Sequence, residues 1–307
     1  MAMPYDGTGG SATNVIRGID VDKLAKGFAV EANVFKQFCT TSKTNAREIR
    51  WYKKTAGFLD STGTTGITTS DISNTSSLAR PHVIQPELSR KTSYVRKFMA
   101  ESPWLSIEDI NDSDIDILAT TVRDVTAGVQ RKVDLRIYSV LVEAAEATPT
   151  VPNPTDMPDG ASTGPGWNTV ASCNPITDIL TAKQSIRSFG YDPEGAVVLM
   201  NSIEHKWLMN YLINVKGSSI PAFSSDKVKT GVVMELLGCR IVVSENVTTD
   251  SVIVFVPQRT LTFKSYMPLA TAILDEPGIG KKFRVWEECE VLLTDPNSGY
   301  HITNTIV

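Results

Sequence analysis

One apolar stripe through the middle of this 307-residue chain constrains its fold more than any other feature. Apolar residues recur at steps of three and four, at Ile115, Leu118, Val122, Val125, Val129, Val133, Ile137, Val140 and Ala144. This spacing predicts a single helix over residues 113–146, about 50 Å long at about 1.5 Å per residue. Ser113 and Asp116 provide a capping pattern at its start, and Pro149 follows its end. The helix is longer than those of ordinary globular domains.

Three kinds of structure use a helix of this length: a membrane span, a coiled coil and a scaffold on which other elements pack. Charged side chains inside the helix exclude the span, namely Arg123, Asp124, Arg131, Lys132, Asp134 and Arg136. The stripe lasts fewer than five heptads and has no second such segment as a partner in the chain. We therefore favour the scaffold helix and keep a coiled coil as the alternative.

The composition is that of a folded, soluble protein, with 41% hydrophobic residues and a net charge of -4. The acidic balance argues against a protein that grips nucleic acid through a broad basic face. No secretion signal or long apolar run is present, which predicts a cytoplasmic site of synthesis. The cysteines at 39, 173, 239 and 289 lack metal-binding spacing, so buried free thiols are expected.

Before the long helix, the chain predicts an arm with a short helix around 20–38, then a hairpin over 47–99. Ile49 and Trp51 alternate in its outgoing strand, and Tyr94, Arg96 and Phe98 in its returning strand. Of the 17 residues from 61 to 77, 13 are Ser, Thr or Gly, which cannot supply a core. We expect a neighbouring molecule to order this stretch.

The hairpin is basic. Its cations could bind an acidic partner surface or a nucleic acid, or they could simply be solvated. Because the whole chain is acidic, a neighbouring copy is a sufficient partner. The predicted intersubunit contacts are Arg50, Trp51, Lys53, Lys54, Arg90, Arg96, Lys97 and Arg123.

After the long helix, residues 148–166 hold five prolines and three glycines, which indicates a linker. Beyond it, Asn174 and Pro175 start a helix, a buried strand covers 196–200, and Asn201 with Glu204 caps a second helix. A polar loop at 217–230 precedes strands at 239–243, 252–256 and 261–263, and two more strands follow within 282–307. The chain therefore predicts an α+β fold.

Three strings imitate catalytic or binding motifs, and each lacks an essential part. Residues 160–164 match GxSxG, but prolines bracket them inside the linker. The acids at 112, 114 and 116 imitate an EF-hand, but Ile117 and Arg123 occupy its glycine and twelfth positions. Residues 278–281 imitate a phosphate loop without its first glycine or its Ser/Thr. We predict no enzyme activity, no metal site and no cofactor.

This order of elements resembles the Hong Kong 97-type major capsid proteins of tailed viruses. Two strings carry the resemblance best: the strand Tyr191–Asn201, which ends in Met-Asn before a helix, and Leu237–Ser244, which has Arg240 where relatives often have proline. The resemblance implies five regions: an N-arm (1–45), an extended loop (46–99), a peripheral domain (100–173) with the spine helix 113–146, an axial domain (174–265) and C-terminal strands that return to the peripheral domain (266–307).

The resemblance also implies a function. The chain would self-assemble into pentamers and hexamers of an icosahedral bacteriophage shell in the host cytoplasm, around double-stranded DNA held by weak, non-specific contact. Many relatives begin with a helical scaffolding segment, and because this chain shows none, we expect either a processed form or a separate scaffolding protein. A portal and a decoration protein are further expected partners. Two alternatives remain: an encapsulin-type nanocompartment shell, and an enzyme or adhesin of another α+β family.

Overall fold

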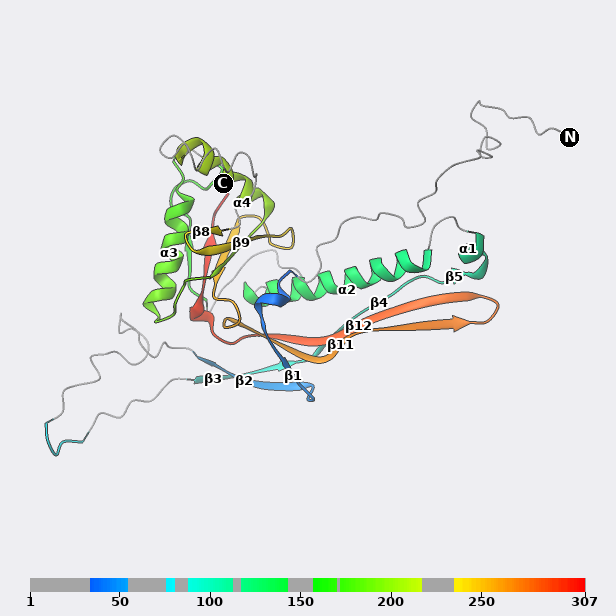
Figure 1. Cartoon of the computed structure of the whole chain (residues 1–307). Coiled ribbons are helices and arrows are strands. Elements are labelled where there is room, and N and C mark those ends of the chain that lie inside the picture. Colours follow the sequence, from blue (N-terminus) through cyan, green and yellow to red (C-terminus); the bar gives the residue numbers. More distant parts are fainter. Residues whose placement is uncertain are drawn as a thin grey trace, which may run out of the picture.

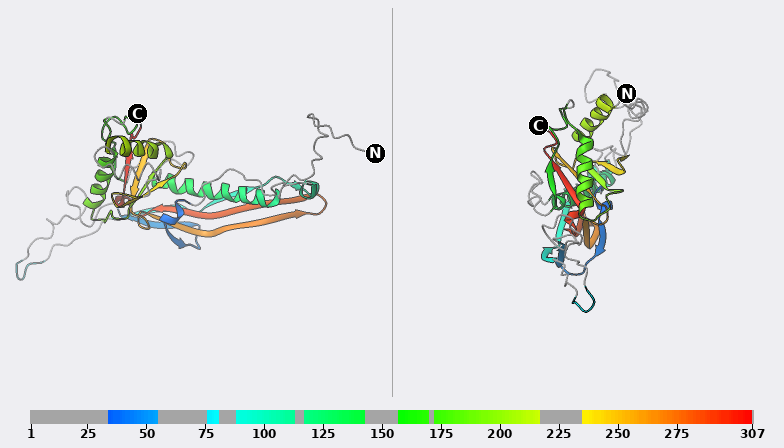
Figure 2. Two further views of the ribbon diagram at one scale, coloured as in Figure 1. Left: turned by 45° about the horizontal axis from the view of Figure 1, so that its top comes forward. Right: turned by 90° about the vertical axis from the view of Figure 1, so that its left-hand side faces the viewer.

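The computed structural model describes residues 34–54, 76–80, 88–112, 117–142, 157–169, 172–216 and 235–306. The chain forms an elongated module around the long helix α2 and a shorter module that carries α3 and α4 (Figure 1). The left view in Figure 2 also shows the shorter module at one end of the elongated one. The molecule is therefore long and thin.

The elongated module is a five-stranded sheet with α2 along it (Figure 1). Its strand order is β1-β11-β12-β4, and β5 pairs with β12 farther along. The β11–β12 pair is antiparallel, and β1 runs parallel to β11. Its elements are β1 (Thr40–Lys43), β4 (Arg96–Glu101), β5 (Leu105–Ser106), α1 (Ile107–Asp112), α2 (Ile117–Leu141), β11 (Leu261–Glu276) and β12 (Gly280–Leu293).

The long helix confirms the prediction from the apolar stripe, with a shorter C-terminal end. α2 ends at Leu141 and Val142 lies in a turn, whereas the stripe predicted a helix to residue 146. Leu141 and Val142 are adjacent in sequence and both are buried. A helix that continued with a single apolar stripe would bury only one of the two. Residues 113–116 and 143–156 lie outside the described part.

The shorter module is a six-stranded sheet of order β6-β13-β10-β7-β9-β8. The helices α3 and α4 pack against one of its faces. Its elements are β6 (Asp159–Ala161), α3 (Pro175–Ser188), β7 (Val197–Met200), α4 (Ser202–Tyr211), the π-turn η4 (Leu212–Lys216), β8 (Glu235–Leu236), β9 (Cys239–Val243), β10 (Ser251–Phe255), the 3-10 turn η5 (Pro296–Ser298) and β13 (Gly299–Thr303).

The helix starts follow the predicted capping residues, with one difference. The Asn174 side chain accepts a hydrogen bond from the Thr177 N–H, and the Asn201 side chain accepts one from the Ile203 N–H. Glu204 does not complete the predicted capping box, because it is buried and its Oε1 accepts the Asp250 N–H at 2.6 Å. Glu204 thus ties α4 to the loop before β10.

One hydrophobic core is shared by both modules. The face of β7 and β10 that turns away from α3 and α4 packs on the C-terminal half of α2 and on β11 and β12. The segment that leads into β1 fills the junction through Phe35 and Phe38, around the 3-10 turn η2 (Lys36–Phe38). A second core lies between α3, α4 and the other face of the six-stranded sheet. The shared core fixes the two modules to each other.

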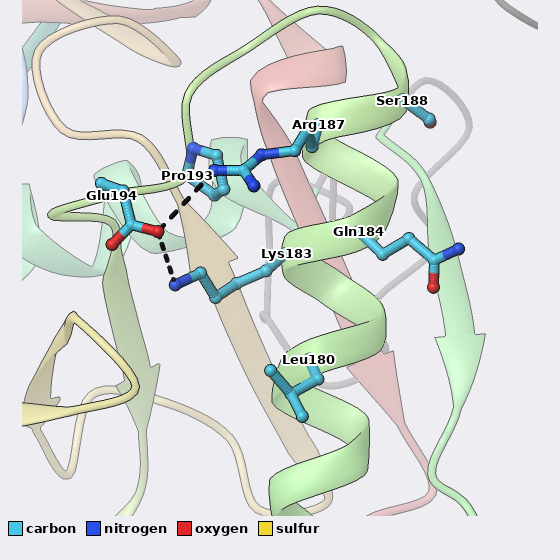
Figure 3. A pocket seen from close by; sticks show the side chains of 7 residues that line it. All are labelled: Leu180, Lys183, Gln184, Arg187, Ser188, Pro193 and Glu194. Carbon is cyan, nitrogen blue, oxygen red and sulfur yellow. Dashed lines mark hydrogen bonds and ion pairs between the residues drawn. The ribbon is translucent and has the colours of Figure 1, made fainter.

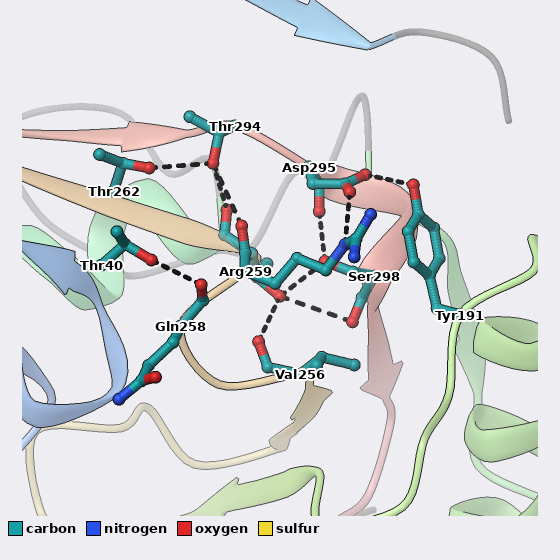
Figure 4. A network of polar contacts seen from close by, with 10 residues as sticks. Thr40, Tyr191, Val256, Gln258, Arg259, Thr262, Thr294, Asp295 and Ser298 are labelled. Atoms are coloured by element: carbon teal, nitrogen blue, oxygen red, sulfur yellow. Dashed lines mark hydrogen bonds and ion pairs between the residues drawn. The ribbon is translucent and has the colours of Figure 1, made fainter. Parts of the chain in front are cut away.

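A polar cluster fixes the corner where the chain passes between the two sheets (Figure 4). The Tyr191 hydroxyl donates to Asp295 at 2.8 Å, and the Arg259 guanidinium donates to the same carboxylate at 3.1 Å. Burial and the Asp295 carboxylate raise the pKa of Tyr191. The Thr260 and Ser298 hydroxyls are 2.7 Å apart. The links from β10 to β11 and from β12 to β13 are thereby bound together.

The strands differ from the predicted ones at four places. Tyr94 ends β3, but Arg96 and Phe98 belong to β4 in the five-stranded sheet. Residues 159–161 of the predicted linker form β6. The C-terminal segment divides, because the turn η5 at Pro296 sends β13 into the six-stranded sheet. β11, predicted as three residues, extends over sixteen.

Several predicted features lie wholly or mostly outside the described residues: the helix around 20–38 before its last turn, the Ser/Thr/Gly stretch up to residue 75, and the polar loop at 217–230.

Candidate intersubunit surfaces

The basic hairpin forms a separate two-stranded sheet of β2 (Glu48–Lys54) and β3 (Leu88–Tyr94). Its outer face carries Arg50 and Tyr52 on β2, and Arg90 lies opposite Tyr52 on β3. The Tyr52 side chain is 62% exposed, and Tyr94 on the same face is 65% exposed. Isolated two-stranded hairpins are at best marginally stable in water, so this sheet gains from a further contact.

The opposite face of the hairpin contacts its own chain more closely. Ile49 is buried, and the Trp51 indole N–H donates to the Ser93 hydroxyl at 3.0 Å. At the base of the hairpin, the Val95 N–H donates to the Arg47 carbonyl at 2.9 Å. The hairpin is thus attached at one end, with one face exposed.

The structure brings some of the predicted contact residues together and separates others. Arg50, Trp51, Lys53, Lys54 and Arg90 share the hairpin. Arg96 and Lys97 lie on β4, and Arg123 lies on α2 beside Asp124 at 3.3 Å.

A buried glutamate strip, made of Glu287, Glu288 and Glu290 of β12, was not predicted. Arg96 of β4 and Arg136 of α2 both contact Glu290, at 3.1 and 2.6 Å. Three acids within four residues of a buried strand interrupt its apolar alternation, and this interruption was the available signal. Buried carboxylates need partners, so the strip organises the segments around it.

The remaining partners of the glutamate strip are two cations from segments before β4 and one cation of β4 itself. Lys36 contacts Glu287 at 2.5 Å, and Arg47 and Lys97 each approach Glu288 to 3.7 Å. With Arg96 and Arg136, the strip joins the segment before β1, the base of the hairpin, β4 and α2.

Asp134 of α2 holds the segment before β1. It is fully buried, and its Oδ2 accepts the Val34 N–H at 2.6 Å. Burial raises the pKa of Asp134 from 3.8 to about 6, while hydrogen bonds from the backbone of Val34 and Phe35 act in the opposite direction.

An open groove of about 620 Å³ lies between α3 and the turn before β7 (Figure 3). Figure 3 shows Lys183 and Arg187 reaching from α3 toward Glu194. The Lys183 ammonium also donates to the Leu237 carbonyl at 2.6 Å. These groups neutralise one another, and the groove contains no nucleophile beside a base. It is lined by Leu180, Lys183, Gln184, Arg187, Ser188, Pro193 and Glu194.

The serine of the GxSxG string has a structural role. Ser162 directly follows β6, and its hydroxyl donates to the Asn304 carbonyl. A bend follows it instead of the helix that a nucleophile elbow requires. Of the glycines of residues 278–281, Gly278 lies in the turn between β11 and β12, and Gly280 begins β12.

A second serine lies beside a histidine, at a site closed to substrate. The Ser251 hydroxyl is 2.7 Å from His301 Nε2, and both residues have no exposed surface. Burial lowers the pKa of His301 from 6.5 to about 4. Among the described residues, His301 Nδ1 has no hydrogen-bond partner, so the acid that would orient a catalytic histidine is missing.

Within the described ranges, no group of three His, Cys, Asp or Glu side chains could hold a metal ion. In the same ranges, no helix is long and apolar enough to cross a membrane.

A comparison with family profiles decides between the remaining classes. The profile of the phage capsid protein family matches residues 104–295, more than half of the chain. The chain belongs to the phage capsid protein family. This capsid protein is a structural protein of the virion shell, not an enzyme.

Solved structures give the same fold for this capsid protein at low identity. A structure from Mycobacterium phage Che8 is 16% identical with TM-score 0.64, covering 96% of this chain and 99% of the other. The capsid of cyanophage P-SCSP1u is 14% identical with TM-score 0.66, covering 96% and 95%. A virus-like particle from Pyrococcus furiosus is 11% identical with TM-score 0.55, covering 88% and 91%.

These likenesses confirm the predicted Hong Kong 97-like α+β fold. They give the nanocompartment alternative no better support than the phage shell. The search of curated proteins found no match.

Proposed function

We propose that this capsid protein assembles into the pentamers and hexamers of an icosahedral shell, with the β2–β3 hairpin of each copy on a neighbouring copy. The observation that carries the proposal is the hairpin itself, a separate sheet with exposed Tyr52 and Tyr94 on the face that carries Arg50 and Arg90. Tyrosine and arginine are enriched in the most deeply buried parts of protein–protein interfaces. A single subunit leaves this face in water.

The proposed regions follow the two sheets. The five-stranded sheet and α2 would form the peripheral domain, and the six-stranded sheet with α3 and α4 would form the axial domain around the symmetry axes. The hairpin residues Arg50, Trp51, Lys53, Lys54 and Arg90, with Arg123 of α2, remain the proposed contacts. Arg96 and Lys97 already pair with the glutamate strip, so their role would lie inside the subunit.

The proposed cargo is double-stranded DNA, held by weak and non-specific contact. The net charge of -4 supports weak contact, because DNA packed with its own counterions needs little neutralisation by the shell. We propose assembly in the host cytoplasm with a separate scaffolding protein, and a portal and decoration protein as further partners.

Sedimentation velocity with negative-stain electron microscopy tests the proposed assembly. The purified full-length protein would be examined over a concentration series, at low and near-physiological salt. We expect closed shells, or rings of five and six subunits that grow with concentration. Monodisperse monomers at every concentration and salt would contradict the proposal.

A further inference from the structure

Residues 34–38, which lead into β1, form a short segment that lies against the C-terminal half of α2 (Figure 1, blue against green). We call them the anchor segment. Phe35 and Phe38 are buried in the core that the two modules share. The Gln258 N–H donates to the Phe38 carbonyl at 2.7 Å, so a backbone contact fixes the end of the segment nearest β1.

The other end of the anchor segment depends on one buried side chain, Asp134 of α2. Asp134 Oδ2 accepts the Val34 N–H at 2.6 Å, and the backbone of Phe35 and Lys36 also hydrogen-bonds to this carboxyl group. Three consecutive backbone groups therefore share one acceptor. Buried N–H groups that lose their acceptor are costly, so this carboxyl group holds the segment in place.

The second oxygen of Asp134 has a different environment. Asp134 Oδ1 is buried and has no hydrogen-bond partner among the described residues. Two cations of the same region are engaged elsewhere, Lys36 with Glu287 at 2.5 Å and Arg136 with Glu290 at 2.6 Å. An ionised carboxyl group with an unpaired oxygen is costly to bury, whereas a protonated one is neutral. The closed anchor segment therefore favours a proton on Asp134.

The charged groups around Asp134 do not outweigh its burial. The Lys36 ammonium favours the ionised form, yet burial raises the pKa of Asp134 to about 6. Burial also raises the pKa of the Cys39 thiol, which is therefore neutral in the same range of pH. The titratable side chains of the elements packed here are Lys36 and Cys39 before β1, Arg131, Arg136 and Tyr138 on α2, Arg240 on β9, and Glu287, Cys289 and Glu290 on β12.

We propose that Asp134 is a proton-operated latch: the anchor segment is held on α2 while Asp134 carries a proton, and it opens more readily once that proton is lost. This inference concerns the single subunit and goes beyond the proposed shell. Residues 1–33 precede the anchor segment, so opening of the latch loosens the point at which they join the subunit.

The direction of the pH effect follows from proton binding. In the open form Asp134 is in water, where its pKa returns toward 3.8, so near neutral pH the open form holds fewer protons than the closed form. Opening therefore becomes more favourable as the pH rises toward 6 and levels off above that value. Because opening also exposes Phe35 and Phe38, the open form stays a small fraction, and the latch changes the size of that fraction.

Hydrogen exchange of the full-length protein, measured by mass spectrometry from pH 5 to pH 7.5, tests the latch. Exchange rates divided by those of an unstructured peptide at the same pH give the equilibrium constant for opening. We expect this constant to rise about tenfold for the anchor segment between pH 5 and pH 7, and to change little above pH 7. Protection of the anchor segment should be lower than that of residues 133–141 of α2.

Two Asp→Asn variants of α2 provide the comparison. Asp134→Asn is neutral at every pH, so the rise in the opening constant should fall to within about twofold. Asp124→Asn makes the same change at an exposed position of α2 and should keep the tenfold rise. Circular dichroism checks folding, and sedimentation velocity checks that one oligomeric state is present throughout. If Asp134→Asn does not fold, the wild-type profile decides through its levelling near neutral pH.

Three results would overturn the latch: an opening constant that is the same at pH 5 and pH 7, a rise that Asp134→Asn retains, and equal protection of the anchor segment and residues 133–141. The last result would mean that the segment opens only when the whole subunit unfolds. A protein that never assembles would overturn the proposed function and leave the latch standing, because the exchange is measured within one subunit.

Discussion

At the residue scale, the buried ionisable groups explain how the subunit responds to pH. Asp134 has a folded pKa of about 6 against an ordinary value of 3.8, so its contribution to stability is present at low pH and is lost as the pH rises through about 6. His301 acts in the opposite direction. Its folded pKa of about 4 means that its contribution is lost as the pH falls from about 6.5 toward 4.

Asp134→Asn isolates the first contribution. Asparagine keeps an oxygen that can accept the Val34 N–H but carries no charge. The free energy of unfolding of the variant, relative to the wild type, should rise by about 1 kcal/mol between pH 5 and pH 7. Urea unfolding of the unassembled subunit at both pH values measures this, and the effect of His301 cancels in the difference. A difference independent of pH would contradict the assigned pKa.

At the element scale, local sequence patterns predicted where helices and strands lie better than they predicted which strands pair with one another. The apolar stripe predicted α2, and Asn174 and Asn201 predicted the starts of α3 and α4. Alternation runs unbroken from Tyr94 to Phe98, so no local signal showed that β3 ends and β4 joins another sheet. The placement of β13 likewise depends on long-range pairing with β10.

The glutamate strip is the clearest element that sequence reasoning missed, and Glu290→Gln tests its role. The change leaves Arg96 and Arg136 beside a neutral group in a buried place. We expect a loss of about 2 kcal/mol or more in the free energy of unfolding.

Glu194→Gln is the matched control for that loss. Glu194 makes an exposed pair with Lys183, which should be worth about 1 kcal/mol or less. Chemical denaturation of both variants compares them, and equal losses would show that the strip is not a special anchor.

At the scale of the whole molecule, two sheets share one core, and the β2–β3 hairpin forms a sheet of its own. The α+β class and the shell function were predicted from the order of elements and are confirmed. The contact residues stay a prediction: composition identified the basic hairpin, but it could not show that Arg96 and Lys97 face glutamates of the same chain. The pairing of β5 with β12 is likewise a contact between residues far apart in sequence.

The central claim is that this capsid protein works through contacts between copies, and that the β2–β3 hairpin of each copy makes these contacts. A cryo-electron microscopy reconstruction of assembled particles tests it most directly, at a resolution that places both sheets. We predict subunits in rings of five and six, with Tyr52 and Tyr94 of every hairpin covered by another copy. Hairpins that project into solvent, with both tyrosines uncovered in every ring, would contradict the account.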